Sequence, residues 1–329
     1  MITDLFGRAL DYLRVSVTDK CNLRCAYCLP AEGVPLVPHR DILTFEEIER
    51  LVGVFASMGV RKVRVTGGEP LVRRGIVDLI GRIVRIPGIE SVPMTTNGLL
   101  LAQYAGFLKE AGLSRLNVSL DTLRADRFAE ITGSASLPGV FEGLAAARDA
   151  GFKRIKINAV LIRGFNDDEL FDFADLADEW DFDVRFIEYM PFAGTTWERG
   201  KFMPASEAVA RLREKFALDP MEKRSPSDPA YAFRIPGRKG SIGFIASVSE
   251  SFCQSCTRLR LTAEGRLIPC LHADVSLDLR GPMRGGATDG DLAALIQEGA
   301  RLKPKAHEDF LKNFSSEAAR RRKMISIGG

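Results

Sequence analysis

The sequence predicts an α/β fold in which a parallel sheet, curved into a barrel, carries its helices on the outside. Two observations lead to this prediction. Strand-like segments rich in Val and Ile alternate with helical patterns up to residue 191, and such alternation is typical of parallel sheets covered by helices. Within those segments apolar and polar residues also alternate, so each predicted strand has one apolar face and one polar face.

The predicted strands and helices follow one another along the chain. The strand-like segments are residues 13–18, 62–68, 91–98, 115–121, 154–162 and 183–191. The first helix begins with a capping box formed by Thr44 and Glu47, and it ends near Gly59. Further helices are predicted near residues 74–86, 99–111, 139–150 and 167–180, and Gly112 and Gly151 end two of them.

The polar face of the predicted sheet indicates a ligand. Strands buried on both faces are normally continuous apolar runs, but here Val63 and Val65 alternate with Lys62 and Arg64. A barrel satisfies this pattern if its apolar residues pack against the helices and its polar residues line the interior. Ordinary closed barrels fill the interior with branched aliphatic residues, so a polar interior predicts a charged ligand. An antiparallel sheet with one solvated face is the alternative.

The pattern changes after residue 191. A helix is predicted over residues 204–216, and residues 223–241, rich in Pro, Gly and Ser, resemble a connecting segment. Two β segments follow, with a turn at Glu264 and Gly265, and then two polar helices. We therefore expect two regions, a barrel over residues 1–220 and a C-terminal region over residues 221–329 that ends in a Gly-Gly tail.

Composition and charge exclude several functions. The chain has 329 residues, 46% hydrophobic and 27% charged, with a net charge of +3. This mild charge argues against bulk binding of nucleic acid but allows a local pocket for a small anion. No long apolar run predicts a membrane span, and no segment resembles a signal peptide. The expected location is the cytoplasm, where thiols stay reduced.

The six cysteines form two trios, and no cysteine lies elsewhere. Cys21, Cys25 and Cys28 have the spacing C-x3-C-x2-C, and the second trio, C-x2-C-x13-C, consists of Cys253, Cys256 and Cys270. Three thiolates suit a 4Fe–4S cluster with one iron open to another ligand. Disulfides are the alternative, as is zinc, for which His39 or His272 would complete a site.

Two arginines within the second trio point to an anionic ligand. In "TRLRLT", Arg258 and Arg260 alternate with leucines, so both guanidinium groups leave the same face of a strand. Guanidinium forks suit phosphate groups or a purine edge. A solvated strand face is the alternative interpretation.

The first trio resembles the signature of the radical S-adenosylmethionine (SAM) enzymes. The cysteines follow the first strand, an aromatic residue precedes the last of them, and "GGEP" follows the second strand. In this family the open iron of a 4Fe–4S cluster binds SAM, which is cleaved to methionine and a 5'-deoxyadenosyl radical. The resemblance implies that four residues contact SAM, namely Tyr27, Gly68, Ser119 and Met190.

Almost the whole chain resembles one branch of these enzymes, the GTP 3',8-cyclases of molybdenum cofactor biosynthesis. The matching segments include "LRVSVTDKCNLRCAYC", "VTGGEPLVR", "RFIEYMP" and "FCQSCTRLRLTAEGRLIPCL". The resemblance implies an incomplete (β/α)6 barrel, with a C-terminal segment that holds a second 4Fe–4S cluster. It also implies GTP contacts from Arg14, Arg64, Thr95, Lys156, Arg258 and Arg260, and we expect further phosphate contacts from Lys62 and Arg185.

The implied activity is that of a radical SAM lyase. Hydrogen abstraction from C3' of GTP and attack of C3' on guanine C8 would give 3',8-cyclo-7,8-dihydro-GTP. The implied partners are a low-potential electron donor and a downstream cyclic pyranopterin-forming enzyme, and the family resemblance is compatible with a homodimer. One alternative is a radical SAM enzyme that modifies a peptide and carries an auxiliary cluster. Another is a non-catalytic metal-binding protein.

Overall fold

The computed structural model describes residues 1–306 apart from 30–34, 191–197, 224, 226 and 251, so the predicted Gly-Gly tail lies outside the described residues. A single sheet runs through the described residues in the strand order β12-β11-β10-β1-β2-β3-β4-β5-β6-β9-β8-β7. The strands are β1 (Tyr12–Ser16), β2 (Lys62–Thr66), β3 (Pro93–Thr96), β4 (Arg115–Ser119), β5 (Lys156–Leu161), β6 (Asp183–Glu188), β7 (Asp219–Met221), β8 (Tyr231–Arg234), β9 (Ser241–Ile245), β10 (Arg258–Leu261), β11 (Arg266–Ile268) and β12 (Leu277–Asp278).

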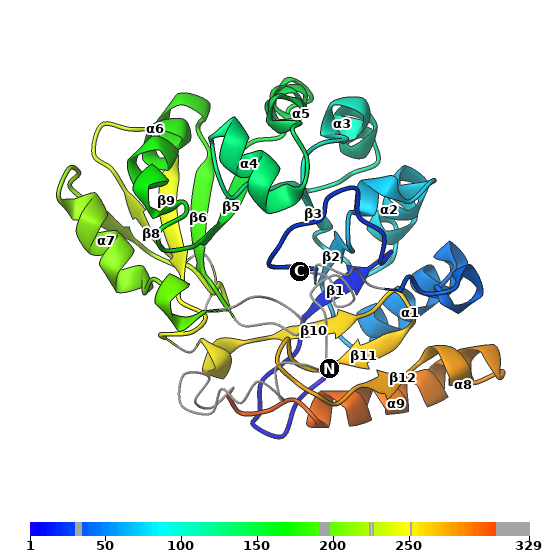
Figure 1. The fold of residues 1–329 in the computed structure, drawn as a ribbon. Coiled ribbons are helices and arrows are strands. Elements are labelled where there is room, and N and C mark those ends of the chain that lie inside the picture. The colour runs from blue at the N-terminus through cyan, green and yellow to red at the C-terminus, as the bar shows by residue number, and fades with distance from the viewer. Residues whose placement is uncertain (30–34, 191–197, 224, 226, 251, 307–329) are drawn as a thin grey trace.

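The first six strands form the predicted parallel sheet, since each pairs in parallel with its neighbour in sequence. The expectation of a parallel α/β fold is therefore confirmed, and the antiparallel alternative is wrong for these strands. Figure 1 shows α2, α3, α5 and α6 along the outer side of the curved sheet, and α4 nearer to its interior. The apolar residues of the strands face these helices: Val15, Val63 and Val65 are completely buried in the main hydrophobic core.

Helices occur where the sequence predicts them, with one addition. They are α1 (Phe45–Ser57), α2 (Ile76–Val84), α3 (Leu101–Glu110), α4 (Ala125–Thr132), α5 (Leu137–Asp149), α6 (Leu170–Trp180), α7 (Ala205–Arg213), α8 (Arg280–Arg284) and α9 (Asp289–Arg301). The capping box of Thr44 and Glu47 is present at the start of α1. The sequence pattern does not predict helix α4, because its eight residues, about two turns, carry only a narrow apolar stripe that includes Phe128 and Ile131.

The C-terminal region extends the barrel sheet at both edges. Strand β10 pairs in parallel with β1, and β9 pairs in parallel with β6. The predicted turn between β10 and β11 is confirmed, and Gly265 has the positive φ of 81° that such a turn favours. The prediction that residues 223–241 only connect is wrong in part, because Tyr231–Arg234 forms β8 and pairs with β9. The Pro and Gly residues on both sides of "YAFR" concealed this short edge strand.

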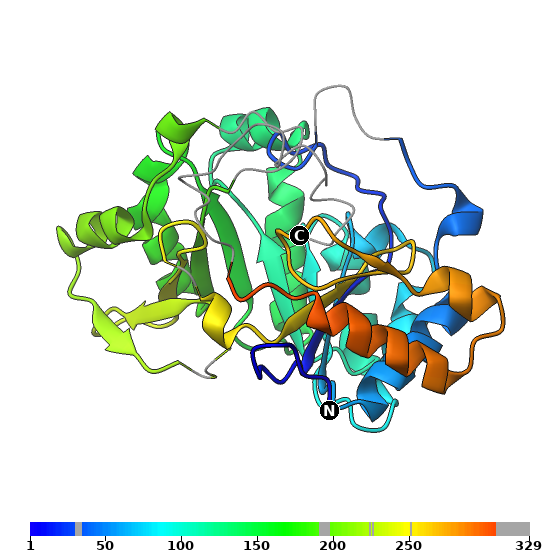
Figure 2. The same ribbon diagram turned by 90° about the horizontal axis from the view of Figure 1, so that it is seen from below.

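The last described helix returns to the beginning of the chain. Helix α9 contacts α1 and β11, and Figure 2 shows it, in orange, running beside these elements near the N-terminus. Gln297 on α9 exchanges hydrogen bonds with the backbone of Thr3. This packing places the segment after α9 close to the second cysteine trio. No helix in the described part of the chain is both long and apolar enough to cross a membrane.

Candidate active site

Two rows of polar side chains cross the inner face of the sheet where β10, β1 and β2 lie side by side. In one row Arg14 of β1 is in register with Arg260 of β10 and Arg64 of β2. In the next row Tyr12 is in register with Arg258 and Lys62. The parallel pairing of β10 with β1 therefore brings together cations that are some 200 residues or more apart in the sequence. Arg260 is buried in this arrangement, so the alternative interpretation of a solvated strand face is wrong for this residue.

Tyr12 lies at the centre of this cationic group. Its hydroxyl accepts a hydrogen bond of 2.5 Å from Nε of Arg64, and Nζ of Lys62 lies 4.4 Å from the centre of its ring. Burial raises the pKa of Tyr12, but the charges of Arg64, Arg14 and Lys62 outweigh burial and lower it to about 7. Tyr12 is not among the residues predicted for the site, although it precedes Arg14 by two residues and so shares its strand face.

The inner cations are crowded and desolvated. Burial lowers the pKa of Arg14 to about 9, with Arg260 adding repulsion, and it lowers the pKa of Arg260 to about 10 with repulsion from Arg258. Across the barrel, burial and the charge of Arg185 lower the pKa of Lys156 to about 7. Thr95 joins the same site, since its Oγ1 accepts a hydrogen bond of 3.1 Å from Nη1 of Arg64. Positive charges confined in this way favour a multiply charged anion among them.

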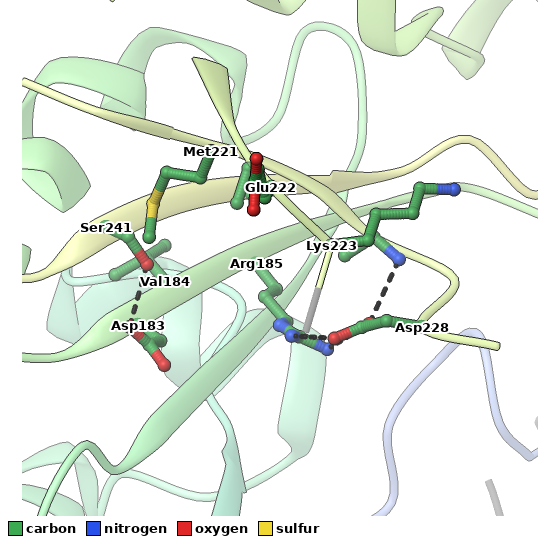
Figure 3. Close-up of a pocket in the computed structure, with 11 residues that line it drawn as sticks. Asp183, Val184, Arg185, Met221, Glu222, Lys223, Asp228 and Ser241 are labelled. Carbon is green, nitrogen blue, oxygen red and sulfur yellow. Dashed lines mark hydrogen bonds and ion pairs between the residues drawn. The ribbon is translucent and has the colours of Figure 1, made fainter. Parts of the chain in front are cut away.

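Arg185 has a carboxylate partner in the pocket of Figure 3, which lies along the first residues of β6 and β9. The two guanidinium nitrogens of Arg185 lie 3.2 Å and 3.0 Å from the carboxylate oxygens of Asp228, which belongs to the β7–β8 connection. The charge of Asp228 also opposes the loss of the proton from Lys156. Asp228 is thus a second residue of the site that is not among the predicted ones.

The first cysteine trio lies on the loop after β1, at the carboxyl end of the barrel strands, where barrel active sites are built. Cys21, Cys25 and Cys28 are all free thiols. The chain folds back on itself here, because the amide of Cys28 donates to the carbonyl oxygen of Cys25. Burial raises the pKa of Cys25, and the nearby Cys28 and Cys21 raise it further. Three neighbouring thiols on one loop are suited to hold a metal centre, whose positive charge would balance the negative charge of the thiolates.

The glycines of "GGEP" hold this loop against β2. A Cβ atom on Gly68 would lie 2.4 Å from the carbonyl oxygen of Lys20, which directly precedes Cys21. The next residue, Glu69, donates its amide to the same oxygen. Its buried carboxylate accepts hydrogen bonds from Leu71 N, Thr96 Oγ1 and Asn97 N. Burial raises the pKa of Glu69 to about 7.

The residues assigned to SAM by resemblance lie at the same end of the barrel. Ser119 is the last residue of β4, and Met190 follows β6 by two residues. The hydroxyl of Tyr27 donates a 2.7 Å hydrogen bond to Asp121, whose other oxygen accepts from the amide of Val160. Burial raises the pKa of Asp121 to about 6. Asp121 was missed, since the sequence pattern shows it only as the end of a strand.

Two asparagines provide unused hydrogen-bonding capacity inside the barrel. Asn117 of β4 stands in register between Thr95 and Lys156, and Asn158 of β5 is in register with Ser119. The Oδ1 atoms of both are buried and have no hydrogen-bond partner among the described residues. A buried acceptor without a partner is costly, so these atoms fit a polar ligand with N–H or O–H donors. No sequence signal beyond the strand alternation marks them.

The second cysteine trio lies beside the arginine strand. Cys253 begins a short 3-10 helix, Cys256 precedes β10 by two residues, and Cys270 follows β11 by two. Burial raises the pKa of the Cys256 thiol, but Arg258 and Lys303 outweigh it and lower the pKa to about 6. All three cysteines are free, so the disulfide alternative finds no support. His272 lies in the turn after Cys270 and stays a predicted alternative ligand.

The donor set of each trio fits an iron–sulfur cluster. Each trio offers three cysteines, and a 4Fe–4S cluster held by three thiolates has one iron open to another ligand. The first trio follows the carboxyl end of β1, and Cys256 precedes β10, which runs parallel to β1. The two trios would therefore hold one cluster at each end of the cationic interior.

Comparison with known proteins agrees with this geometry. Residues 15–177 match the model of the radical SAM superfamily, and residues 182–309 match the model named Molybdenum Cofactor Synthesis C. A solved structure of Streptococcus suis SuiB aligns over 89% of this chain and 66% of its own, with a TM-score of 0.60 and 16% identity. The fold and the first trio thus define a radical SAM enzyme.

The particular branch follows from the closer relatives. The GTP 3',8-cyclase of Pelotomaculum thermopropionicum is 48% identical over 99% of both chains, and that of Moorella thermoacetica is 45% identical over 99% of both. Molybdenum cofactor biosynthesis protein 1 of Mus musculus is 43% identical over 99% of this chain and 51% of its own length. This chain belongs to the GTP 3',8-cyclase family.

Proposed function

We propose that this protein converts GTP to 3',8-cyclo-7,8-dihydro-GTP, the first step of molybdenum cofactor biosynthesis. The reaction removes hydrogen from C3' of GTP and joins C3' to C8 of the guanine. The observation that carries the proposal is the parallel pairing of β10 with β1, which aligns Arg260, Arg14 and Arg64. A triphosphate needs such a set of cations, whereas a peptide substrate does not.

The first trio would hold the cluster that binds SAM. When bound and reduced, this cluster supplies the electron that cleaves SAM to methionine and a 5'-deoxyadenosyl radical. Cys21, Cys25 and Cys28 would hold this cluster and would leave one iron available to the amino and carboxylate groups of SAM. Around it, Tyr27, Gly68, Ser119 and Met190 would line the SAM site. Gly68 acts through its backbone, because there is no space for a side chain beside Lys20.

The cationic interior would hold GTP. Arg14, Arg64, Lys62, Lys156 and Arg185 lie on four barrel strands, and the register of Asn117 with Lys156 places a further polar side chain beside them. These groups would neutralise the phosphates and fix the ribose, with Thr95 and the asparagine oxygens as polar contacts. Arg258 and Arg260 would reach the nucleotide from β10. Fixing C3' in one place is the main contribution of the protein, because a radical reacts with whatever lies near it.

The second trio would hold the second cluster against the guanine. Cys253, Cys256 and Cys270 would hold this cluster and would leave one iron available to the base, as the family resemblance implies. In this assignment residues 1–220 bind SAM and residues 221–329 close the nucleotide site. A low-potential donor supplies electrons, and the product passes to a cyclic pyranopterin-forming enzyme in the cytoplasm. A homodimer is compatible with these roles.

The experiment uses the reconstituted protein with SAM, dithionite and GTP deuterated at C3'. We expect deuterium in the 5'-deoxyadenosine, detected by mass spectrometry. GTP deuterated at C8 is the control and should yield unlabelled 5'-deoxyadenosine. Unlabelled 5'-deoxyadenosine from C3'-deuterated GTP would contradict abstraction at C3'. SAM cleavage that is independent of GTP would favour a peptide-modifying enzyme.

A further inference from the structure

Lys303 lies next to the second cysteine trio, although it is 47 residues from Cys256 in the sequence. It follows α9 by two residues, and only 3% of it is exposed. Its Nζ donates hydrogen bonds of 2.8 Å to the carbonyl oxygen of Arg258 and 2.9 Å to that of Pro269. The sulfur of Cys256 lies 3.6 Å from the same nitrogen. The three donors of the ammonium group are therefore all engaged.

These contacts connect the two backbone segments that carry Cys256 and Cys270, which we call two arms of the trio. Arg258 follows Cys256 by two residues on one arm, and Pro269 directly precedes Cys270 on the other. One ammonium group thus sets the distance between the backbone segments that carry Cys256 and Cys270. The arms are otherwise joined through the short antiparallel pairing of β10 with β11.

The third arm is held in a related way by Arg8. Its Nη1 donates a 2.6 Å hydrogen bond to the carbonyl oxygen of Cys253, and its Nη2 donates one of 2.6 Å to Pro304, the residue after Lys303. Arg8 itself is fixed by an ion pair of 2.5 Å with Asp4, whose side chain is buried. The N-terminal segment and the segment after α9 thus form one support for all three cysteines.

Among the described residues, no carboxylate balances the charge of Lys303. In the part of the chain that the structure describes, Lys303 forms no ion pair with Asp or Glu, while Arg8 and Arg258 repel it. A buried charge without a counterion is unfavourable. The anionic groups that it faces are the thiols of Cys256 and Cys270 in their thiolate form. Cluster formation requires that form, so a bound cluster would provide the missing negative charge.

We propose that Lys303 is a positioning residue for the second cluster, which joins the arms of Cys256 and Cys270 and donates an N–H···S hydrogen bond to Cys256. This inference rests on the proposed second cluster. Hydrogen bonds to sulfur and nearby positive charge favour the reduced, more negative state of an iron–sulfur cluster. Lys303 therefore raises the reduction potential of this cluster as well as retaining it.

The test isolates the second cluster in the full chain by replacing Cys21, Cys25 and Cys28 with Ala. After anaerobic reconstitution this parent should contain about four irons per chain. Lys303→Met keeps the length of the side chain but removes the donors and the charge. Removal of groups that support metal ligands typically lowers metal affinity roughly 10- to 100-fold, so we expect a chelator to remove its iron about 10-fold more readily than that of the parent. Its reduction potential should be more negative, and its electron paramagnetic resonance signal should be altered.

Lys305→Met is the matched control, because Lys305 is exposed two residues further on, and it should match the parent in all three measurements. Lys303→Arg keeps the charge, so its potential should lie nearer to that of the parent, and it provides the measurement if the Met variant does not fold. Equal iron retention, potential and spectrum in the Lys303 and Lys305 variants would overturn the proposal. A parent without iron would overturn the second-cluster assignment itself, and the inference with it.

Discussion

Tyr12 and Lys156 are two interior groups whose protonation changes near neutral pH. The pKa of Tyr12 is about 7 because the nearby cations outweigh burial, and the pKa of Lys156 is about 7 because burial and Arg185 disfavour its charge. As the pH rises above 7, an increasing fraction of the free protein therefore contains a Tyr12 phenolate and a neutral Lys156. A bound triphosphate favours the protonated form of both groups.

At pH 8, GTP binding should accordingly be accompanied by the uptake of about two protons per chain. At pH 6, few protons should be taken up, because both groups are already protonated in the free protein. GTP affinity should decrease as the pH rises above 7. Calorimetric titration in buffers of different ionisation enthalpy measures this uptake. Tyr12→Phe and Lys156→Met should each remove about one of the protons.

Lys153→Met is the control for these titrations, because Lys153 is exposed in the turn before β5. It should bind GTP with the same proton uptake as the unaltered protein. Uptake that persists in both the Tyr12 and the Lys156 variants would show that these residues do not face the phosphates.

At the scale of elements, the turn after β2 supports the loop after β1. Gly67 and Gly68 approach the backbone of residues 18–20 so closely that added Cβ atoms would lie 2.8 Å and 2.4 Å from carbonyl oxygens of that loop. Because the obstructing atoms are backbone atoms, a side chain at Gly68 must displace the segment that leads to Cys21. The spacing of the first trio would change with it.

We therefore expect Gly68→Ala to lower the iron content after reconstitution from about eight to about four per chain, through loss of the first cluster. Iron analysis measures this loss, and circular dichroism checks the fold. Gly106→Ala is the control, since Gly106 is exposed in α3 with open space around it. That substitution should leave iron binding unchanged and stabilise the fold by about 0.5–1 kcal/mol. Full iron content in Gly68→Ala would contradict the supporting role of the turn.

At the scale of the whole molecule, one sheet joins the N-terminal barrel to the C-terminal region. The pairing of β10 with β1 concentrates Arg258, Arg260, Arg14, Arg64 and Lys62 in one place. Repulsion among these groups opposes folding, and an anion that binds among them should relieve it.

We expect GTP to raise the melting temperature of the anaerobic protein, with a stabilisation of about 2.7 kcal/mol at 100 times its dissociation constant. Inorganic triphosphate should also stabilise the protein, whereas guanosine should have little effect. Thermal unfolding followed by circular dichroism measures these shifts. Equal stabilisation by guanosine and triphosphate would contradict the assignment of the cations to the phosphates.

Several features of the fold and the site could be predicted from local sequence. The parallel strands follow from the alternation of strand and helix patterns, and the polar interior follows from residues such as Lys62 and Arg64 that alternate with valines. Strand β8 was missed because its flanking Pro and Gly residues conceal a four-residue edge strand. Asp228 was missed for a related reason, since a carboxylate in such a segment has no periodicity that assigns it to Arg185.

The sequence by itself determined the barrel, the two cysteine trios and the cations that share each strand face, because side-chain periodicity and ligand spacing are local properties. Only the tertiary structure decided which strands are neighbours. It placed β10 beside β1, Asp121 against Tyr27, and Lys303 between the arms of the second trio. These contacts join residues 34 to 246 positions apart, and the burial of the shared core selects among such pairings, so no short segment of the chain records them.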